Sequence, residues 1–171
     1  FTDAVRAYHQ TDVALVNGGT MRGNKIYVAG KLTKKTVTEM HPFGNAVVKI
    51  YATGKELKNY INLMLDCYEK FCGNFVQVSG LRYEFDPKKP TGQRLVKLTD
   101  GDGKDVDESK KFTVAMSDYM LANSPMKHNK LYKMVTLNDA VPIVQALFAS
   151  VEAAGPACVA PALDGRIKKI E

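Results

Sequence analysis

Val13-Ala14-Leu15-Val16-Asn17-Gly18-Gly19-Thr20-Met21-Arg22 and Pro42-Phe43-Gly44-Asn45-Ala46-Val47-Val48-Lys49-Ile50-Tyr51 are the two stretches that decide how this chain folds. In each of them a tight turn adjoins an apolar run that is typical of a buried strand. The paired glycines lack a Cβ atom, so a ligand can approach their backbone closely. Arg22 and Phe43 add a fixed cation and a flat apolar ring, which together suit an aromatic anion such as a nucleotide. The plainer interpretation is two ordinary turns with a surface arginine and a core phenylalanine.

The rest of the pattern predicts helices and strands in irregular alternation. Thr33 caps a short helix that stops before Pro42, and Thr53-Gly54-Lys55-Glu56 is a capping box for a longer one. Asn138 is the expected N-cap of the last helix, with Pro142 in its first turn. The expected helices are 2–10, 34–40, 54–71 and 139–153, and the expected strands are 12–17, 26–29, 46–51, 75–79, 81–86, 93–99, 112–116 and 132–135. Because no steady βαβ rhythm is present, the pattern predicts an α+β fold with a mixed sheet flanked by helices.

Length and composition indicate a single domain over residues 1–171. The 24 basic and 18 acidic side chains leave a net charge of +6. The paired lysines lie near separate turns or chain ends, so solvated loop charge is a better interpretation than a nucleic-acid interface. These pairs are Lys34-Lys35, Lys88-Lys89, Lys110-Lys111 and Lys168-Lys169. No apolar run approaches the roughly 20 residues of a membrane-spanning helix, so no membrane span is expected.

The side chains that usually carry catalysis or bind metals form no recognisable set. His9, His41 and His128 are too scattered for a zinc site of known spacing. Cys67 and Cys72 are five positions apart at the end of a predicted helix, which is an awkward spacing for a disulfide. The sequence contains no CxxC pair, Walker A loop or Gly-x-Ser-x-Gly elbow. We therefore expect no catalytic residue, no metal ligand and no cofactor in this chain.

Several of the motifs occur together, in the same order, in a known family. They are the two turns quoted above, the capping box, and then Phe75-Val76-Gln77-Val78-Ser79-Gly80-Leu81-Arg82-Tyr83, Phe112-Thr113-Val114-Ala115-Met116 and Pro161-Ala162-Leu163-Asp164-Gly165-Arg166-Ile167. In this order they resemble the C-terminal domain of the 5'-nucleotidases, from about Asp3 to the C-terminus. The resemblance implies the fold of that domain. The family's domain opens with a helix that carries an Arg and a Glu, so we expect this chain to be a fragment that lacks most of that first helix.

The resemblance also implies a function for the larger protein. The family consists of two-metal phosphoesterases that hydrolyse nucleotides to nucleosides and phosphate. Two divalent metal ions and the catalytic His and Asp residues lie in an N-terminal metallophosphoesterase domain, which would be the partner of this chain. The chain alone is therefore expected to bind nucleotides without hydrolysing them, within a hydrolase of nucleotide catabolism. The resemblance further implies a secreted protein, located extracellularly, at the cell surface or in the periplasm, that could form a homodimer.

The substrate-binding residues of the family can be matched to positions in this sequence. Arg22 matches an arginine that contacts the nucleotide. Phe43 matches one of two aromatic residues that sandwich the base. Positions around the nucleoside correspond to Asn17, Asn45 and Gly80. The resemblance thus implies that residues far apart in the sequence form one nucleotide site.

Two departures from the family pattern fall in one segment. Tyr119 is the candidate for the second aromatic residue, but strict alignment on Leu121-Ala122-Asn123 puts Met120 in that position. After this asparagine the family usually has Gly-Gly-Asp-Gly, whose Asp holds the ribose hydroxyls. This chain has Ser124-Pro125-Met126-Lys127 instead and offers no carboxylate there. We therefore expect weak nucleotide binding that barely distinguishes ribose from 2'-deoxyribose.

Two functions from different classes follow from these observations. The first is a nucleotide-binding C-terminal domain of a 5'-nucleotidase-like phosphoesterase, which the intact Arg22 and Phe43 favour. The second is an interaction or dimerisation module that has lost ligand recognition, which the altered segment 124–127 favours. Binding of adenosine or AMP distinguishes the two.

Overall fold

Strand β1 (Val13–Asn17) is the centre of the fold, because apolar side chains cover both of its faces. The computed structural model describes residues 1–70, 72–128, 141–155 and 159–170. Val13 and Leu15 point into one core cluster, and Ala14 and Val16 point into another. This division follows from the strand itself, in which successive side chains point to opposite faces. β1 is thus buried like a strand in a sheet that is covered on both sides.

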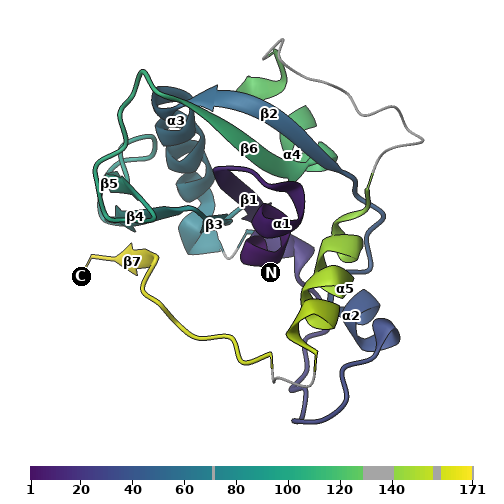
Figure 1. Ribbon diagram of the computed structural model, residues 1–171. Helices are drawn as coiled ribbons and strands as arrows, with labels where there is room; N and C mark the ends of the chain where they lie inside the picture. The colour runs from purple at the N-terminus through teal and green to yellow at the C-terminus, as the bar shows by residue number, and fades with distance from the viewer. Residues whose placement is uncertain (71, 129–140, 156–158, 171) are drawn as a thin grey trace.

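Among the described residues, the strands form two sheets (Figure 1). The larger has the order β2-β6-β1-β3, where β2 is Val47–Thr53, β3 is Val76–Ser79 and β6 is Lys111–Ser117. Strand β6 runs parallel to β1, whereas β2 pairs antiparallel with β6, and β3 pairs antiparallel with β1. The smaller has the order β5-β4-β7, where β4 is Leu81–Phe85, β5 is Leu95–Asp100 and β7 is Ile167–Lys169. Both sheets are mixed, since β4 is antiparallel to β5 and parallel to β7.

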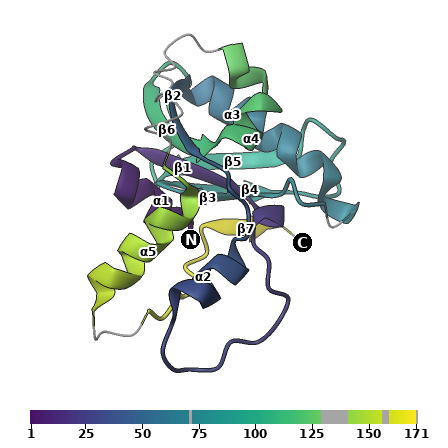
Figure 2. The ribbon, with the colours of Figure 1, turned by 90° about the vertical axis from the view of Figure 1, so that its right-hand side faces the viewer.

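Helices cover the two faces of the larger sheet (Figure 2). Helix α3 (Gly54–Met64) packs on the face of Val13 and Leu15, while α1 (Thr2–His9) and α5 (Ile143–Ala154) pack on the other face. Helix α2 (Lys34–Met40) contacts α5, and α4 (Asp118–Ala122) follows β6 directly. The arrangement confirms the predicted α+β fold of mixed sheets flanked by helices.

The predicted caps explain where the helices begin. The Thr53 side chain accepts a hydrogen bond from the Glu56 N–H, and the Glu56 carboxylate accepts one from the Thr53 N–H at 2.7 Å. This is the reciprocal capping box that the sequence predicts, and it satisfies two backbone donors at the start of α3. Thr33 caps α2 through a bond of the first kind, in which its side chain accepts from the Thr36 N–H.

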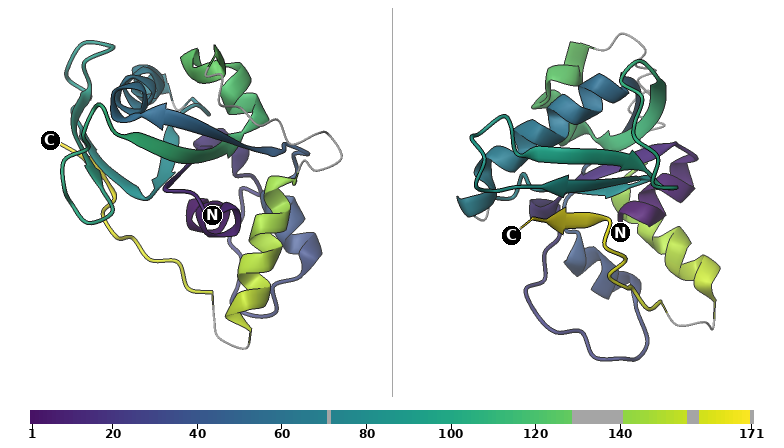
Figure 3. Two further views of the ribbon diagram at one scale, coloured as in Figure 1. Left: turned by 45° about the horizontal axis from the view of Figure 1, so that its top comes forward. Right: turned by 90° about the vertical axis from the view of Figure 1, so that its left-hand side faces the viewer.

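The C-terminal segment lies against the start of the chain and extends the smaller sheet (Figure 3). Arg166 forms ion pairs of 2.7 Å with both Asp3 and Asp164. Hydrogen bonds from the Arg166 guanidinium lower the pKa of Asp164 to about 2. Strand β7 is absent from the sequence prediction, because a strand of three residues has no periodicity of its own.

Two predicted elements in the first half of the chain are wrong in part or in full. Residues 26–29 form no strand, and the Ile26 and Val28 side chains are 93% and 87% exposed. The predicted helix 54–71 is α-helical only to Met64 and then continues as the 3₁₀ helix η2 (Leu65–Lys70). The Leu65 carbonyl accepts a hydrogen bond of 2.8 Å from Arg94 Nη1, so a long-range contact helps to change the backbone there.

The last helix begins later than predicted. Pro142 is extended, with ψ of 142°, and α5 starts at Ile143 rather than within 139–142. The reason is pairing with a distant segment, since the Val141 carbonyl accepts from the Val47 N–H, and the Ile143 N–H donates to the Asn45 carbonyl. The predicted strand 132–135 and the predicted cap Asn138 lie outside the described residues.

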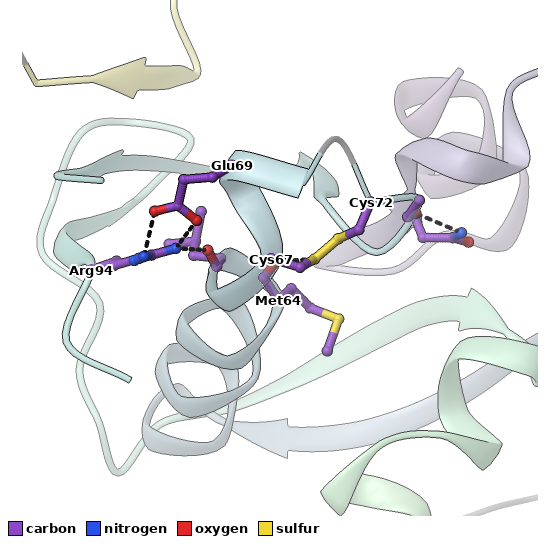
Figure 4. Close-up of a disulfide and its surroundings, with 8 residues drawn as sticks. Met64, Cys67, Glu69, Cys72 and Arg94 are labelled. Atoms are coloured by element: carbon purple, nitrogen blue, oxygen red, sulfur yellow. Dashed lines mark hydrogen bonds and ion pairs between the residues drawn. A yellow bond between two sulfur atoms is a disulfide. The ribbon is translucent and has the colours of Figure 1, made fainter. Parts of the chain in front are cut away.

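Cys67 and Cys72 form a disulfide, so the expectation from their spacing is wrong (Figure 4). Their Cα atoms are 5.8 Å apart, which is within the usual range for this bond. A regular helix over 54–71 would separate the two side chains. The α-helix ends at Met64 instead, and Cys67 lies in the 3₁₀ helix that follows.

We expect mild acid to destabilise the fold through its buried histidines. Burial, with a smaller effect of Lys49, lowers the pKa of His9 from 6.5 to about 4. The unfolded chain therefore takes up a proton at higher pH than the folded chain, and the free energy of unfolding falls as the pH drops from about 6.5 to about 4. Denaturant titrations at pH 7, 6 and 5 measure this fall, and the variant His9→Phe reduces it. Burial also lowers the pKa of His41, so part of the fall should remain in His9→Phe. An unchanged pH dependence in His9→Phe would contradict this assignment.

Candidate functional site

One edge of the larger sheet gathers the two turns that flank its strands. Strands β1 and β6 are parallel and both end at this edge, while β2 and β3 run the other way and begin there. The strand register shows the same arrangement, because Val47 at the start of β2 pairs with Ser117 at the end of β6, and Asn17 at the end of β1 pairs with Val76 at the start of β3. The chain after β1, the chain before β2 and helix α4 after β6 are therefore neighbours. Residues about 100 positions apart in the sequence meet in this way.

Arg22 and Phe43 are in direct contact at this edge. The guanidinium carbon of Arg22 lies 5.1 Å from the centre of the Phe43 ring, which is a cation–π distance. The Arg22 N–H donates to the Met40 carbonyl at 2.8 Å, which ties the first turn to the end of α2. Both side chains are exposed, the phenylalanine by 38%, so neither is a core residue. Within the described part of the chain, no carboxylate pairs with Arg22, and its charge faces solvent.

His41 joins the two turns beneath the surface. It is 1% exposed, and its Nδ1 lies 3.2 Å from the Thr20 carbonyl oxygen and 3.3 Å from the Thr20 hydroxyl. Burial lowers the pKa of His41, so the ring is neutral at pH 7. A carbonyl can only accept, which assigns the proton to Nδ1. The His41 ring also makes edge contacts with Phe1 and Phe43, so it helps to hold the Phe43 side chain in place.

The paired glycines serve a different purpose from the predicted one. The Gly18 and Gly19 N–H groups donate to the carbonyls of Phe75 and Gly73, at 2.7 and 2.8 Å. A Cβ atom on Gly19 would lie 2.7 Å from the Cα of Gly73, which is too close for any side chain. Asn17 donates through Nδ2 to the same Gly73 carbonyl at 3.0 Å. Here another segment of the chain approaches the glycine backbone, where the sequence suggested a ligand.

Asn45, Asp118 and Tyr119 form the other side of the edge. Asn45 Nδ2 donates to Asp118 Oδ1 at 3.1 Å, and the Tyr119 N–H donates to the same oxygen at 2.7 Å. The Asp118 N–H donates to the Ala46 carbonyl, which joins α4 to the second turn. Tyr119 is 54% exposed, whereas Met120 is 3% exposed and belongs to the core. Of these two residues, Tyr119 is thus the one that reaches the surface.

Asp118 is a site residue that sequence reasoning missed. Its carboxylate is exposed at the end of β6, next to Asn45 and Tyr119. The signal in the sequence was its position between a predicted strand and Tyr119, where side chains at strand ends tend to gather. The segment after α4 offers no carboxylate in place of the family's Asp. Ser124 is buried there, and Pro125 opens the short 3₁₀ helix η3 (Pro125–His128).

Gly80 does not join the other predicted residues. Ser79 pairs with Ala14, so Gly80 follows the end of β3 that lies opposite the Asn17 edge. Its φ of +78° and the carbonyl of Asp12 against it explain the glycine without any ligand. It lines a polar cavity of about 420 Å³ together with Arg6 and Arg82, among other residues. The edge therefore holds five of the six predicted substrate-binding residues.

The described ranges contain neither a cluster of metal ligands nor a membrane-spanning helix. No group of three or more His, Cys, Asp or Glu side chains there could hold a metal ion. The two divalent ions implied by the family resemblance thus have no fitting ligand set among those residues, and no chemical step is assigned to them. None of the described helices is long and apolar enough to cross a membrane.

A family model described as the 5'-nucleotidase, C-terminal domain, matches residues 1–138. This chain belongs to the 5'-nucleotidase C-terminal domain family. Among solved structures, a 5'-nucleotidase precursor from Thermus thermophilus superposes with a TM-score of 0.80 at 26% identity, over 99% of this chain and 34% of that one. The Haemophilus influenzae NAD nucleotidase shares the fold, with a TM-score of 0.72 at 16% identity over 98% of this chain and 32% of that one.

Curated relatives of this 5'-nucleotidase C-terminal domain are longer proteins. Protein 5NUC of Lutzomyia longipalpis is 26% identical over 96% of the chain, and the match covers 30% of that relative. Endonuclease YhcR of Bacillus subtilis is 29% identical over 75% of the chain and 10% of the relative. The chain thus spans about a third or less of the length of the relatives it matches.

Proposed function

We propose that this chain is the nucleotide-binding domain of a 5'-nucleotidase-like phosphoesterase. The observation that carries the proposal is the exposed contact between Arg22 and Phe43, at an edge that also holds Tyr119. An arginine without a carboxylate partner among the described residues is available for a phosphate, and two exposed rings are available for a base. Asn17 and Asn45 support the site, because each fixes a segment of the edge by a side-chain hydrogen bond.

Each residue has a distinct role in the proposed site. Arg22 binds the anionic part of the nucleotide, since guanidinium groups match phosphate oxygens in charge and geometry. Phe43 and Tyr119 contact the base on their exposed faces. His41 stays neutral and holds Phe43 and the Thr20 backbone in position. Gly80 has no part in the site, because it lies at the other end of β3.

The catalytic step belongs to a different part of the protein in this proposal. Only 34% of the Thermus 5'-nucleotidase precursor is matched by this chain, so most of that protein lies outside the match. We assign the hydrolysis of nucleotides, and the two divalent metal ions that it requires, to an N-terminal metallophosphoesterase domain. The role of this chain is to hold the substrate for that domain. The Cys67–Cys72 disulfide supports an oxidising location, extracellular, at the cell surface or periplasmic.

AMP and adenosine titrated into the purified chain test the proposed site. Phe43→Ala removes a stacking face and should weaken the binding of both ligands by about tenfold, since base–aromatic stacking contributes roughly 1–3 kcal/mol. Arg22→Gln should weaken AMP binding and leave adenosine binding unchanged. Tyr51→Ala is the matched control, because it removes another exposed ring, which lies further along β2. If neither ligand binds the wild-type chain, it is an interaction module instead.

Asp118 suggests that ribose is recognised after all. Its Oδ1 already accepts two hydrogen bonds, and a carboxylate has capacity for about four acceptor contacts. We expect the wild-type chain to bind AMP more tightly than 2'-deoxy-AMP, and Asp118→Asn to reduce this preference by about tenfold. Calorimetric titration of both nucleotides gives the ratio. Equal affinities in the wild type would support the sequence-based expectation that nothing holds the ribose.

A further inference from the structure

The Cys67–Cys72 disulfide lies one residue from the contact that fixes the Gly18-Gly19 turn. Cys67 is part of η2, where its Sγ lies 3.7 Å from the Met64 carbonyl (Figure 4). Cys72 immediately precedes Gly73 in the sequence. Gly73 is the residue whose carbonyl accepts hydrogen bonds from both the Gly19 N–H and the Asn17 side chain. The disulfide therefore anchors the segment against which the turn rests.

The contact between Gly73 and the turn is too close for a side chain on either residue without a shift of the backbone. A Cβ on Gly19 would lie 2.7 Å from the Gly73 Cα, and a Cβ on Gly73 would lie 3.1 Å from the Gly19 Cα. The Gly18 N–H is bound to the Phe75 carbonyl at 2.7 Å, so two hydrogen bonds connect the backbones of the segments. A displacement of Gly73 must therefore move the turn with it.

The turn in turn sets the position of Arg22. The η1 turn (Gly18–Thr20) ends two residues before Arg22, and the Met21 N–H donates to the Gly18 carbonyl at 3.1 Å. The Arg22 side chain reaches over Phe43 from this backbone position. A continuous series of contacts thus leads from the disulfide through Gly73 and the turn to the guanidinium.

A purely stabilising role fits the disulfide less well. In the chain-entropy model, a crosslink stabilises a protein in proportion to the logarithm of the loop that it closes. Cys67 and Cys72 are only five positions apart, so the loop is short and the crosslink constrains the unfolded chain less than one that closes a long loop. The consequence of the bond is mainly local, and Gly73, the next residue in the chain, makes the contact with the turn.

We propose that the Cys67–Cys72 disulfide is a positioning element of the nucleotide site, which holds Arg22 in place for an anionic ligand. The inference rests on the proposed function. Reduction by a dithiol breaks the S–S bond and forms two thiols, while the dithiol closes into its own disulfide. Two electrons and two protons pass to the cysteines in this step. The reduced chain then loses affinity for the phosphate of the ligand and keeps its affinity for the base.

Titrations of AMP and adenosine against oxidised and dithiothreitol-reduced protein test this inference. The background Cys158→Ser removes the third thiol of the chain and prevents exchange with the pair. We expect reduction, or the double variant Cys67→Ser/Cys72→Ser, to weaken AMP binding by about tenfold, as for the loss of one charge-assisted contact. Adenosine binding should stay the same. The unchanged adenosine affinity also reports that the fold is intact.

A second variant tests the same contacts with the disulfide present. Gly73→Ala should reproduce the selective loss of AMP affinity, because the new Cβ displaces the turn at Gly19. Gly101→Ala is the matched control, since only the Gly80 oxygen lies within 4.0 Å of its Cβ. Equal AMP affinity in oxidised and reduced protein, or a parallel loss of AMP and adenosine binding, would overturn the inference and leave the proposed function standing. Failure of the oxidised wild type to bind either ligand would refute the proposed function itself.

Discussion

The backbone contact between Gly19 and Gly73 is the constraint on which the site depends. Two chain segments approach so closely there that a Cβ on Gly19 would lie 2.7 Å from the Gly73 Cα, and a Cβ on Gly73 would lie 3.1 Å from the Gly19 Cα. The contact joins the end of β1, which is buried on both faces, to the segment that leads into β3. Because β1 is held on both faces, the turn after it has a fixed direction, and Arg22 leaves that turn at a fixed point. The position of Arg22 in the candidate site is therefore set by the core and not by the exposed loop that follows.

The strand order explains why distant residues can act together. Parallel pairing of β1 and β6 brings Asn17 and Asp118 to one edge, and antiparallel pairing of β2 brings Asn45 there as well. The hydrogen bond between Asn45 and Asp118 then joins the chain before β2 to helix α4, on which Tyr119 is exposed. The same register sends Gly80 to the opposite end of β3. Topology thus separates a residue that the family pattern alone would include.

Local sequence signals predicted the elements that depend on local physics. The capping box at Thr53, the cap at Thr33 and the buried strand before Asn17 are all present, because each rests on residues within a few positions. Two of the errors have a long-range cause. The α-helical part of the predicted helix 54–71 ends where Arg94 binds the Leu65 carbonyl, and α5 starts late because Val141 pairs with Val47.

For the candidate site, the sequence provided candidate residues but not the contacts between chain segments. Turn chemistry and the family pattern identified Arg22 and Phe43, which are in contact. They could not reveal that the glycines contact Gly73, that Cys67 pairs with Cys72, or that Asp118 lies beside Asn45. Each of these depends on chain segments that meet only after folding. A rule based on residue spacing within one segment cannot indicate which other segment will contact it.

Mapping AMP binding by amide chemical shifts tests the central claim most directly, because it locates the ligand without any substitution. We expect the largest shifts in 17–22, 43–46 and 118–119, at the edge where β1 and β6 end. Gly80 and Arg82, which line the polar cavity of about 420 Å³ at the other end of β3, should not shift. Shifts centred on Gly80 and Arg82, with none at Arg22 and Phe43, would contradict the assignment of the nucleotide site.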